Sequence, residues 1–109
     1  MNYRSLRVGK LIREELSVLI LRELEFPEAI VTLTEVLVDK KLGIAKVEVS
    51  VVPSERAATA LKLLNEHRAR LQHLLLRKIN ITPMPHLRFE IDRGPENAAR
   101  VEKTLLENS

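Results

Sequence analysis

Apolar residues recur every three or four positions near the start of the chain. They are Val8, Leu11, Ile12, Leu16, Leu19, Ile20 and Leu24. This period gathers them on one side of a helix and leaves the charged residues elsewhere around it. Ser5 can cap the first turn, and Pro27 cannot continue the hydrogen-bond ladder. The pattern therefore predicts an amphipathic helix from Ser5 to Leu24.

The hydrophobic period changes to two after Pro27. Ile30 to Val38 is rich in β-branched and aliphatic residues, and Ile44 to Val52 alternates valine and alanine with polar residues. These patterns predict two strands, the second with one buried and one solvated face. The link from Asp39 to Gly43 has turn-forming residues at both ends, so we expect an antiparallel hairpin.

A long apolar stripe follows the hairpin and is interrupted by the charge of Arg68. Its members are Leu61, Leu64, Leu71, Leu75 and Ile79. A single helix from Glu55 to Ile79 would be about 36 Å long. A nine-residue strand spans only about 30 Å. We therefore expect two helices, with Ser54 as the N-cap of the first and a kink at His67, Arg68 and Ala69.

A third strand and a last helix are expected after Pro83 and Pro85. Leu87, Phe89 and Ile91 alternate with charged residues, and Gly94 begins a turn. Residues 95–109 then predict a short C-terminal helix, with one face formed by Ala98, Val101 and Leu105. The order α-β-β-α-α-β-α predicts a two-layer α+β sandwich, and residues 1–109 form a single domain.

Composition narrows the class of protein. At 109 residues and 45% hydrophobic, the chain can build one core, and only Tyr3, Phe26 and Phe89 are aromatic. It contains no cysteine, which excludes disulfides, thiolate metal sites and thiol catalysis. No apolar run is long enough for a bilayer, and the N-terminal segment does not read as a targeting signal. We expect a cytoplasmic protein with no membrane role.

The net charge of +3 conceals a strong segregation of charge. Residues 1–13 and 67–88 contain nine of the eighteen lysines and arginines and none of the fifteen acids, so the rest of the chain carries −6. The nine cations are Arg4, Arg7, Lys10, Arg13, Arg68, Arg70, Arg77, Lys78 and Arg88. Such a field favours a polyanionic partner, most commonly nucleic acid. We predict that these nine residues bind RNA.

Ordinary solvation is the competing interpretation of these cations. Solvated helix faces usually mix both signs of charge, so the acid-free second block favours RNA contact over solvation. Steps of three residues drift slowly around a helix, and we expect the cations of the first block to share one stripe. Lys40 and Lys41 lie at the predicted hairpin tip, where a solvated turn explains them at least as well.

Catalytic and metal chemistry find little support in the sequence. His67 and His73 are six residues apart, and no cysteine or suitably spaced carboxylate joins them and His86 in a tetrahedral set. Glu90 and Asp92 could form an acid–base pair, but strand alternation already explains them. Phosphate loops, nucleophile triads and dinucleotide fingerprints are absent. We expect no enzyme, no cofactor and no metal.

Four segments resemble a known family in their order and spacing. They are Val8 to Leu24 continuing into Glu25-Phe26-Pro27, Val31 to Val36, Ala45 to Ser50, and Pro85 to Phe89 followed by Asp92. Together they resemble the ribosome-binding factor A family, a group of bacterial assembly factors with the type II K-homology (KH) fold. The resemblance implies a sheet ordered 2-1-3, with the third strand parallel to the first.

The same resemblance implies a function. It implies a non-catalytic protein that binds the small (30S) ribosomal subunit and 16S rRNA or its precursor. It also implies a role late in maturation, support for processing of the rRNA 5′ end, and a link to growth in the cold. A protein-interaction module, acting by strand addition or as a homodimer without RNA contact, is the alternative. The leading hypothesis is a monomer.

The chain departs from the family at the expected kink. The family usually has a small residue–x–Gly motif there, whereas this chain has His67, Arg68 and Ala69. Without glycine a left-handed backbone costs more. We therefore expect either right-handed or bridge-region geometry at the kink, or a shallower bend.

Overall fold

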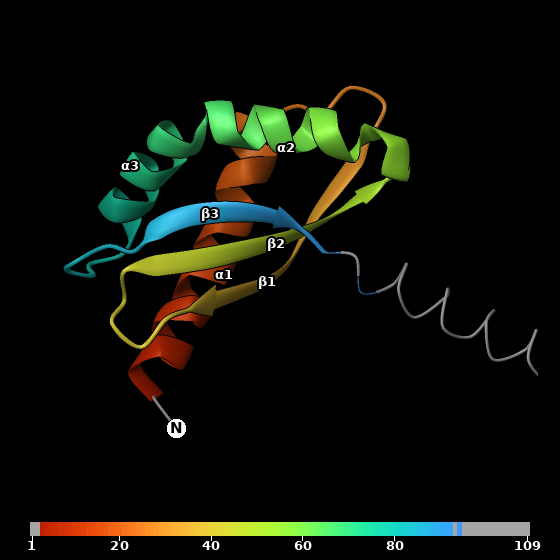
Figure 1. The fold of residues 1–109 in the computed structure, drawn as a ribbon. Coiled ribbons are helices and arrows are strands. Elements are labelled where there is room, and N and C mark those ends of the chain that lie inside the picture. The colour runs from red at the N-terminus through yellow and green to blue at the C-terminus, as the bar shows by residue number, and fades with distance from the viewer. Residues whose placement is uncertain (1–2, 93, 95–109) are drawn as a thin grey trace, which may run out of the picture.

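The computed structural model of the protein describes residues 3–92 and Gly94 (Figure 1). Its elements are α1 (Tyr3–Glu23), β1 (Ile30–Val38), β2 (Ile44–Val52), the 3₁₀ turn η1 (Ser54–Arg56), α2 (Ala57–Glu66), α3 (Arg68–Lys78) and β3 (His86–Ile91). The predicted α+β class and the predicted order of elements up to β3 are confirmed. The helix expected over residues 95–109 lies outside the described residues.

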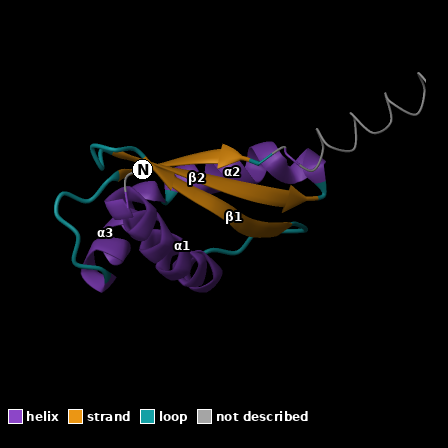
Figure 2. Cartoon of the chain, turned by 90° about the horizontal axis from the view of Figure 1, so that it is seen from below, coloured by secondary structure: helices purple, strands orange, loops and turns teal. Residues whose placement is uncertain are grey.

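Helices cover one face of a three-stranded sheet. Figure 2 shows α1 and α3 together beneath the strands, while α2 lies along β3 and the end of β2. The opposite face of the sheet is left open within the described part of the chain. In residues 3–92 and at Gly94, no helix combines the length and apolar character that a membrane span requires.

The order of the strands differs from the expectation. The sheet is ordered β1-β2-β3, with β1 antiparallel to β2 and β3 parallel to β2, so the expected 2-1-3 order with β3 beside β1 is wrong. Ala45, Val47 and Val49 of β2 are fully buried. The outward residues of β2 from Lys46 to Ser50 are also half-buried, whereas several outward residues of β1 are exposed. A central position for β2 shields it on both edges and explains this difference.

The core is aliphatic and joins every layer. Its fully buried large side chains include Ile12, Leu16 and Leu19 of α1, Leu64 of α2, Leu71 and Leu75 of α3, and Leu87 of β3. These residues occupy one stripe of each helix, as the sequence pattern predicted. Each large aliphatic side chain contributes roughly 1.5–3 kcal/mol when fully buried. Burial of these side chains is therefore the main force that holds the two layers together.

Gly9 allows α1 to approach the sheet closely. A Cβ atom placed on Gly9 would lie 3.1 Å from the backbone oxygen of Val36 in β1. Most real Cβ contacts are longer than this, so a side chain at this position would press the helix away from the strand. The absence of a side chain thus sets the spacing between α1 and β1.

The predicted hairpin turn is confirmed, and the predicted cap of α2 is wrong. In the hairpin link, the Oδ1 atom of Asp39 accepts the backbone N–H of Gly43 at 2.7 Å, but the positive φ of 57° falls on Leu42. Leu42 is buried, so apolar burial accompanies the unfavourable backbone angle. Ser54 is not the N-cap of α2, because Ser54 begins η1. The N-cap of α2 is Arg56, whose side chain makes no capping hydrogen bond.

Val49→Asp is expected to unfold the domain. The substitution places an unpaired carboxylate among fully buried aliphatic side chains, at a cost comparable with a typical total stability of about 5–15 kcal/mol. Far-ultraviolet circular dichroism and urea titration would measure the loss. Ser50→Asp on the outward side of the same strand is the matched control, and a folded Val49→Asp protein would contradict the expectation.

Candidate nucleic-acid interface

Two ion pairs show how α1 and α3 lie against each other. Arg70 Nη2 lies 3.5 Å from Glu23 Oε2, and Lys78 Nζ lies 3.8 Å from Glu15 Oε2. Because the later residue of α3 pairs with the earlier residue of α1, the two helices run antiparallel. We call this boundary, lined by Glu15, Glu23, Arg70 and Lys78, the α1–α3 seam.

The acid-free block at residues 67–88 has carboxylates close to its cations in the folded chain. Arg70 and Lys78 of α3 each face a carboxylate that belongs to α1. The residues next to α3 in sequence give no sign of these carboxylates, because both belong to α1. Among the described residues, Arg68 and Arg77 are the α3 cations that form neither an ion pair nor a side-chain hydrogen bond.

The four cations at the start of α1 do not form one stripe. Arg4 and Arg13 are nine residues apart in a continuous helix, which is two and a half turns, so they lie on opposite sides. Arg4 and Glu15 are about three turns apart and share the side that faces α3. Steps of three residues therefore wind Arg4, Arg7, Lys10 and Arg13 halfway around the helix. All four are exposed.

A groove runs along the other flank of α3. It is lined by Arg68, Ala69, Gln72, His73, Leu76, Met84 and His86. Gln72 Oε1 accepts the backbone N–H of Leu87 at 3.2 Å and so ties α3 to the start of β3. The lining combines a cation, two imidazoles and an amide with three apolar side chains, and it contains no carboxylate. Such a surface suits an anionic ligand with an apolar part.

Arg22 is a cation of this region that the sequence interpretation missed. Its Nε atom lies 3.8 Å from Glu23 Oε1, so Glu23 is held between Arg22 and Arg70. Arg22 lies outside both acid-free blocks because Glu23 follows it directly in the sequence. Its spacing of seven residues from Glu15 places both on the side of α1 that faces α3.

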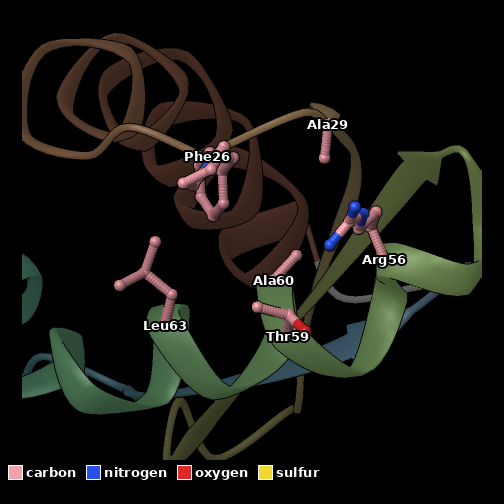
Figure 3. A pocket seen from close by; sticks show the side chains of 7 residues that line it. Phe26, Ala29, Arg56, Thr59, Ala60 and Leu63 are labelled. Carbon is pink, nitrogen blue, oxygen red and sulfur yellow. The ribbon is translucent and has the colours of Figure 1, made fainter.

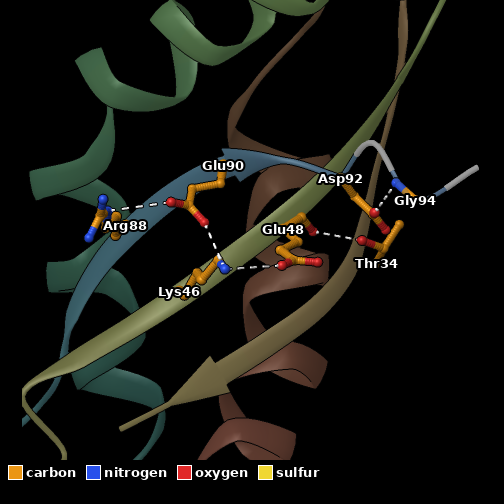
Figure 4. Close-up of polar contacts among 7 residues, drawn as sticks. All are labelled: Thr34, Lys46, Glu48, Arg88, Glu90, Asp92 and Gly94. Atoms are coloured by element: carbon orange, nitrogen blue, oxygen red, sulfur yellow. Dashed lines mark hydrogen bonds and ion pairs between the residues drawn. The ribbon is translucent and has the colours of Figure 1, made fainter. Parts of the chain in front are cut away.

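Arg88 lies away from the helical cations, on the open face of the sheet (Figure 4). Arg88 Nε is 3.6 Å from Glu90 Oε1, and Glu90 Oε2 is 3.2 Å from Lys46 Nζ. Lys46 also lies 3.5 Å from Glu48. The hydrogen bond from Lys46 to Glu90, helped by both carboxylates, raises the pKa of Lys46 above its ordinary value. The network has two cations and two carboxylates, so its net charge is zero.

Asp92 does not have the character of a general acid. The backbone N–H of Gly94 donates to Asp92 Oδ1 at 2.9 Å and, together with the nearby Thr34 hydroxyl, lowers the pKa of the carboxyl. A general acid at neutral pH needs the opposite shift. The neighbouring candidate, Glu90, is engaged in ion pairs with two cations.

The three histidines lie on different elements. His67 is at the junction of α2 and α3, His73 is within α3, and His86 begins β3. His73 and His86 both line the groove, whereas His67 does not. In residues 3–92 and at Gly94, no three side chains of the types that ligate metals come together.

The kink forms without glycine. His67 separates α2 from α3 with φ −101° and ψ 6°, which is the bridge region of the backbone map. Its Nδ1 atom lies 3.0 Å from the carbonyl oxygen of Leu63, which also accepts the backbone N–H of His67 at 3.2 Å. As the donor, Nδ1–H supplies a side-chain cap at the end of α2. Bridge-region geometry is one of the alternatives expected for the kink at His67, Arg68 and Ala69; it is observed at His67, while Arg68 and Ala69 already belong to α3.

A small apolar hollow lies between α2 and the link from α1 to β1. Figure 3 shows Phe26, Ala60 and Leu63 in its lining, with Arg56 at the side. Arg56 is paired with the Glu28 carboxylate. The empty space of about 220 Å³ includes open solvent. Binding sites for small molecules usually measure about 300–1,000 Å³, so this hollow is too small to be one.

The fold and the surface together define a class of protein. A helical pair joined at a kink between two parallel strands, with an added N-terminal helix and strand, is the KH-like arrangement. Its helical side carries the exposed arginines of α3.

Comparison with known proteins names the family. The family model for ribosome-binding factor A matches residues 4–105. A protein of that name from Opitutus terrae is 33% identical over 108 residues, which cover 98% of this chain and 88% of the relative. Another, from Chlorobium phaeobacteroides, is 37% identical over 112 residues and covers 98% and 95%. The chain belongs to the ribosome-binding factor A family.

Solved structures agree with the fold. The crystal structure of ribosome-binding factor A from Thermus thermophilus superposes with a TM-score of 0.67 at 21% identity, covering 83% of this chain and 98% of that one. A solution structure of a candidate ribosome-binding factor A from Thermotoga maritima gives 0.67 at 26% identity, with 86% and 92% covered. A homology model of the Thermus factor, fitted into the cryo-EM map of a 30S complex, gives a TM-score of 0.64 at 23% identity, with 85% and 96% covered.

His67→Ala is expected to lower stability without unfolding the domain. The change removes one half-buried side-chain hydrogen bond, which is worth about 1 kcal/mol. That loss corresponds to a fall in Tm of about 4–8 °C for a domain of this size. Thermal unfolding measures it, with the exposed His73→Ala as the matched control. Equal Tm values for the two variants would show that the side-chain cap does not stabilise the kink.

Proposed function

We propose that this protein binds the small ribosomal subunit as a non-catalytic assembly factor. Membership of the ribosome-binding factor A family is the observation that carries the proposal. The Thermus relative fitted into a 30S complex supports it, because that relative shares the fold. The partner is 16S rRNA or its precursor within the assembling subunit.

The contact surface we propose is the outer side of α3 with both of its flanks. Arg70 and Arg77 are two turns apart and lie on the flank toward α1. Arg68, nine residues before Arg77, lies on the opposite flank in the groove with Met84 and His86. Arginine binds phosphate oxygens in a bidentate manner and also stacks on unpaired bases. With few aromatic residues, recognition depends on RNA shape and backbone more than on base stacking.

Among the cations predicted from sequence, Arg68, Arg70, Arg77 and Lys78 of α3 belong to the proposed surface, and Arg4 of α1 points to the same side about three turns beyond Lys78. Arg7, Lys10 and Arg13 turn progressively away from α3, and Arg88 is on the open face of the sheet. We propose that these four residues contribute little to RNA contact. Arg22 joins the proposed surface through its position beside Glu23 and Arg70.

The finer role we propose follows the family resemblance. The protein acts in the cytoplasm as a monomer, late in maturation of the small subunit. Its binding supports processing of the 16S rRNA 5′ end, and its loss is expected to slow growth in the cold. The non-catalytic part of the proposal agrees with Glu90 and Asp92, whose surroundings keep both carboxylates engaged with cations or N–H donors.

A second candidate function is strand addition at the free edge of β1. Glu35 is the one charged residue among its nine, and Leu21 of the neighbouring α1 is 79% exposed. A groove between the two elements is lined by Ile20, Leu21, Ile30 and Leu33, among others. Capture of a protein partner after nuclease treatment would favour this function over RNA binding.

Binding to purified 30S subunits is expected to be strong at low salt and to weaken steeply as salt rises. Each neutralised phosphate adds about −0.7 to −0.9 to the slope of log affinity against log salt. Co-sedimentation in sucrose gradients at several salt concentrations measures both properties. A protein that stays at the top of the gradient at low salt would refute the proposed function.

Reversing Arg68 and Arg77 to glutamate is expected to weaken subunit binding at least tenfold, because each change replaces a phosphate contact with repulsion. Both side chains are exposed and outside every ion pair in residues 3–92, so circular dichroism should be unchanged. Arg88→Glu reverses one charge on the open face, the same change as in Arg68→Glu alone, and is expected to bind nearly as well as the unaltered chain. A stronger defect in Arg88→Glu would move the site to the sheet.

A further inference from the structure

Two carboxylates lie inside the surface that is proposed to bind RNA. Glu15 and Glu23 of α1 approach Lys78 and Arg70 across the α1–α3 seam at 3.8 and 3.5 Å. A surface selected only for tight binding to a polyanion would not contain them, since each carboxylate cancels part of a neighbouring positive charge.

The carboxylate at one of these pairs is recessed behind its cation. The Glu23 side chain is 21% exposed, whereas its partner Arg70 is 62% exposed. A phosphate can therefore reach the guanidinium without first displacing Glu23, and the carboxylate still repels it from behind. Glu15 and Lys78 are about equally exposed, so there the phosphate and the carboxylate share one cation.

The geometry of these pairs makes them poor positioning devices. Charge-assisted hydrogen bonds that fix a side chain are about 2.7–2.9 Å long. The seam contacts of 3.5–3.8 Å are longer, and Glu23 is divided between Arg70 and Arg22. Exposed pairs of this kind add little to stability. Repulsion of phosphate is therefore the larger effect of Glu15 and Glu23.

We propose that Glu15 and Glu23 limit the affinity of the protein for the small subunit. Their charges partly offset Lys78, Arg70 and Arg22, which shortens the time that the protein stays bound. An assembly factor must leave the particle that it has helped to mature, and a limited residence time serves that need. This inference rests on the proposed function and names the residues that set its strength.

The test uses Glu15→Gln, Glu23→Gln and the double variant of the full chain on purified 30S subunits. Each single change is expected to tighten binding roughly two- to fivefold, chiefly by slowing dissociation. Glu14→Gln is the matched control, because Glu14 is exposed on α1 and forms no ion pair within residues 3–92. It removes the same charge from the same helix and is expected to change affinity much less.

A second measurement asks whether Glu23 acts through Arg22 and Arg70. In the Arg22→Gln/Arg70→Gln background, Glu23→Gln is expected to lose most of its effect, because both cations that it offsets are gone. Circular dichroism confirms that each variant is folded before binding is measured.

Several results would overturn the inference. Affinity that is unchanged or weaker in the folded Glu15→Gln and Glu23→Gln variants would show that the carboxylates do not limit binding. An equal gain in Glu14→Gln would assign the effect to net charge alone. If the unaltered protein does not bind subunits at low salt, the proposed function fails and this inference fails with it. Binding by the unaltered protein with no response to the seam variants overturns this inference only.

Discussion

Packing of the aliphatic side of α1 determines where the other elements of this protein lie. Ile12, Leu16 and Leu19 are fully buried, and α1 contacts both β1 and α3. Gly9 lets the same helix come close to the backbone of β1. Because one helix joins the sheet to α3, its position also sets the α1–α3 seam. The arrangement of surface charge is thus a consequence of apolar packing.

The two faces of the molecule handle charge in different ways. On the open face, Lys46, Arg88 and their glutamate partners lie on neighbouring strands and neutralise one another. On the helical side, Arg68 and Arg77 have no such partners, while Glu15 and Glu23 lie in the seam beside other cations. Within the described residues, the unpaired arginines of α3 therefore lie on the helical side, and this is the side on which we propose that the polyanion binds.

Local patterns in the sequence predicted the elements well, and relations between distant segments less well. The bounds of both hairpin strands and the break at His67 follow from periodicity, because each depends on neighbouring residues alone. The expected sheet order came from the family resemblance and is wrong, and periodicity could not replace it because it does not tell which edge of the hairpin receives β3. The partners of Arg70 and Lys78 come from α1, some fifty to sixty residues earlier. The opposite placement of Arg4 and Arg13 was available from helical geometry.

The irregular pairing in β1 has a consequence for how the protein behaves at high concentration. Register shifts between Leu33 and Glu35, and the Thr34 hydroxyl donates to the carbonyl oxygen of Glu48 at 3.1 Å. The extra residue interrupts the pairing of β1 with β2 at one point and increases the local twist of the strand. An edge with so little charge would otherwise offer a flat template for sheet-to-sheet aggregation. The inserted residue thus disfavours pairing of β1 with another copy of the protein at high concentration.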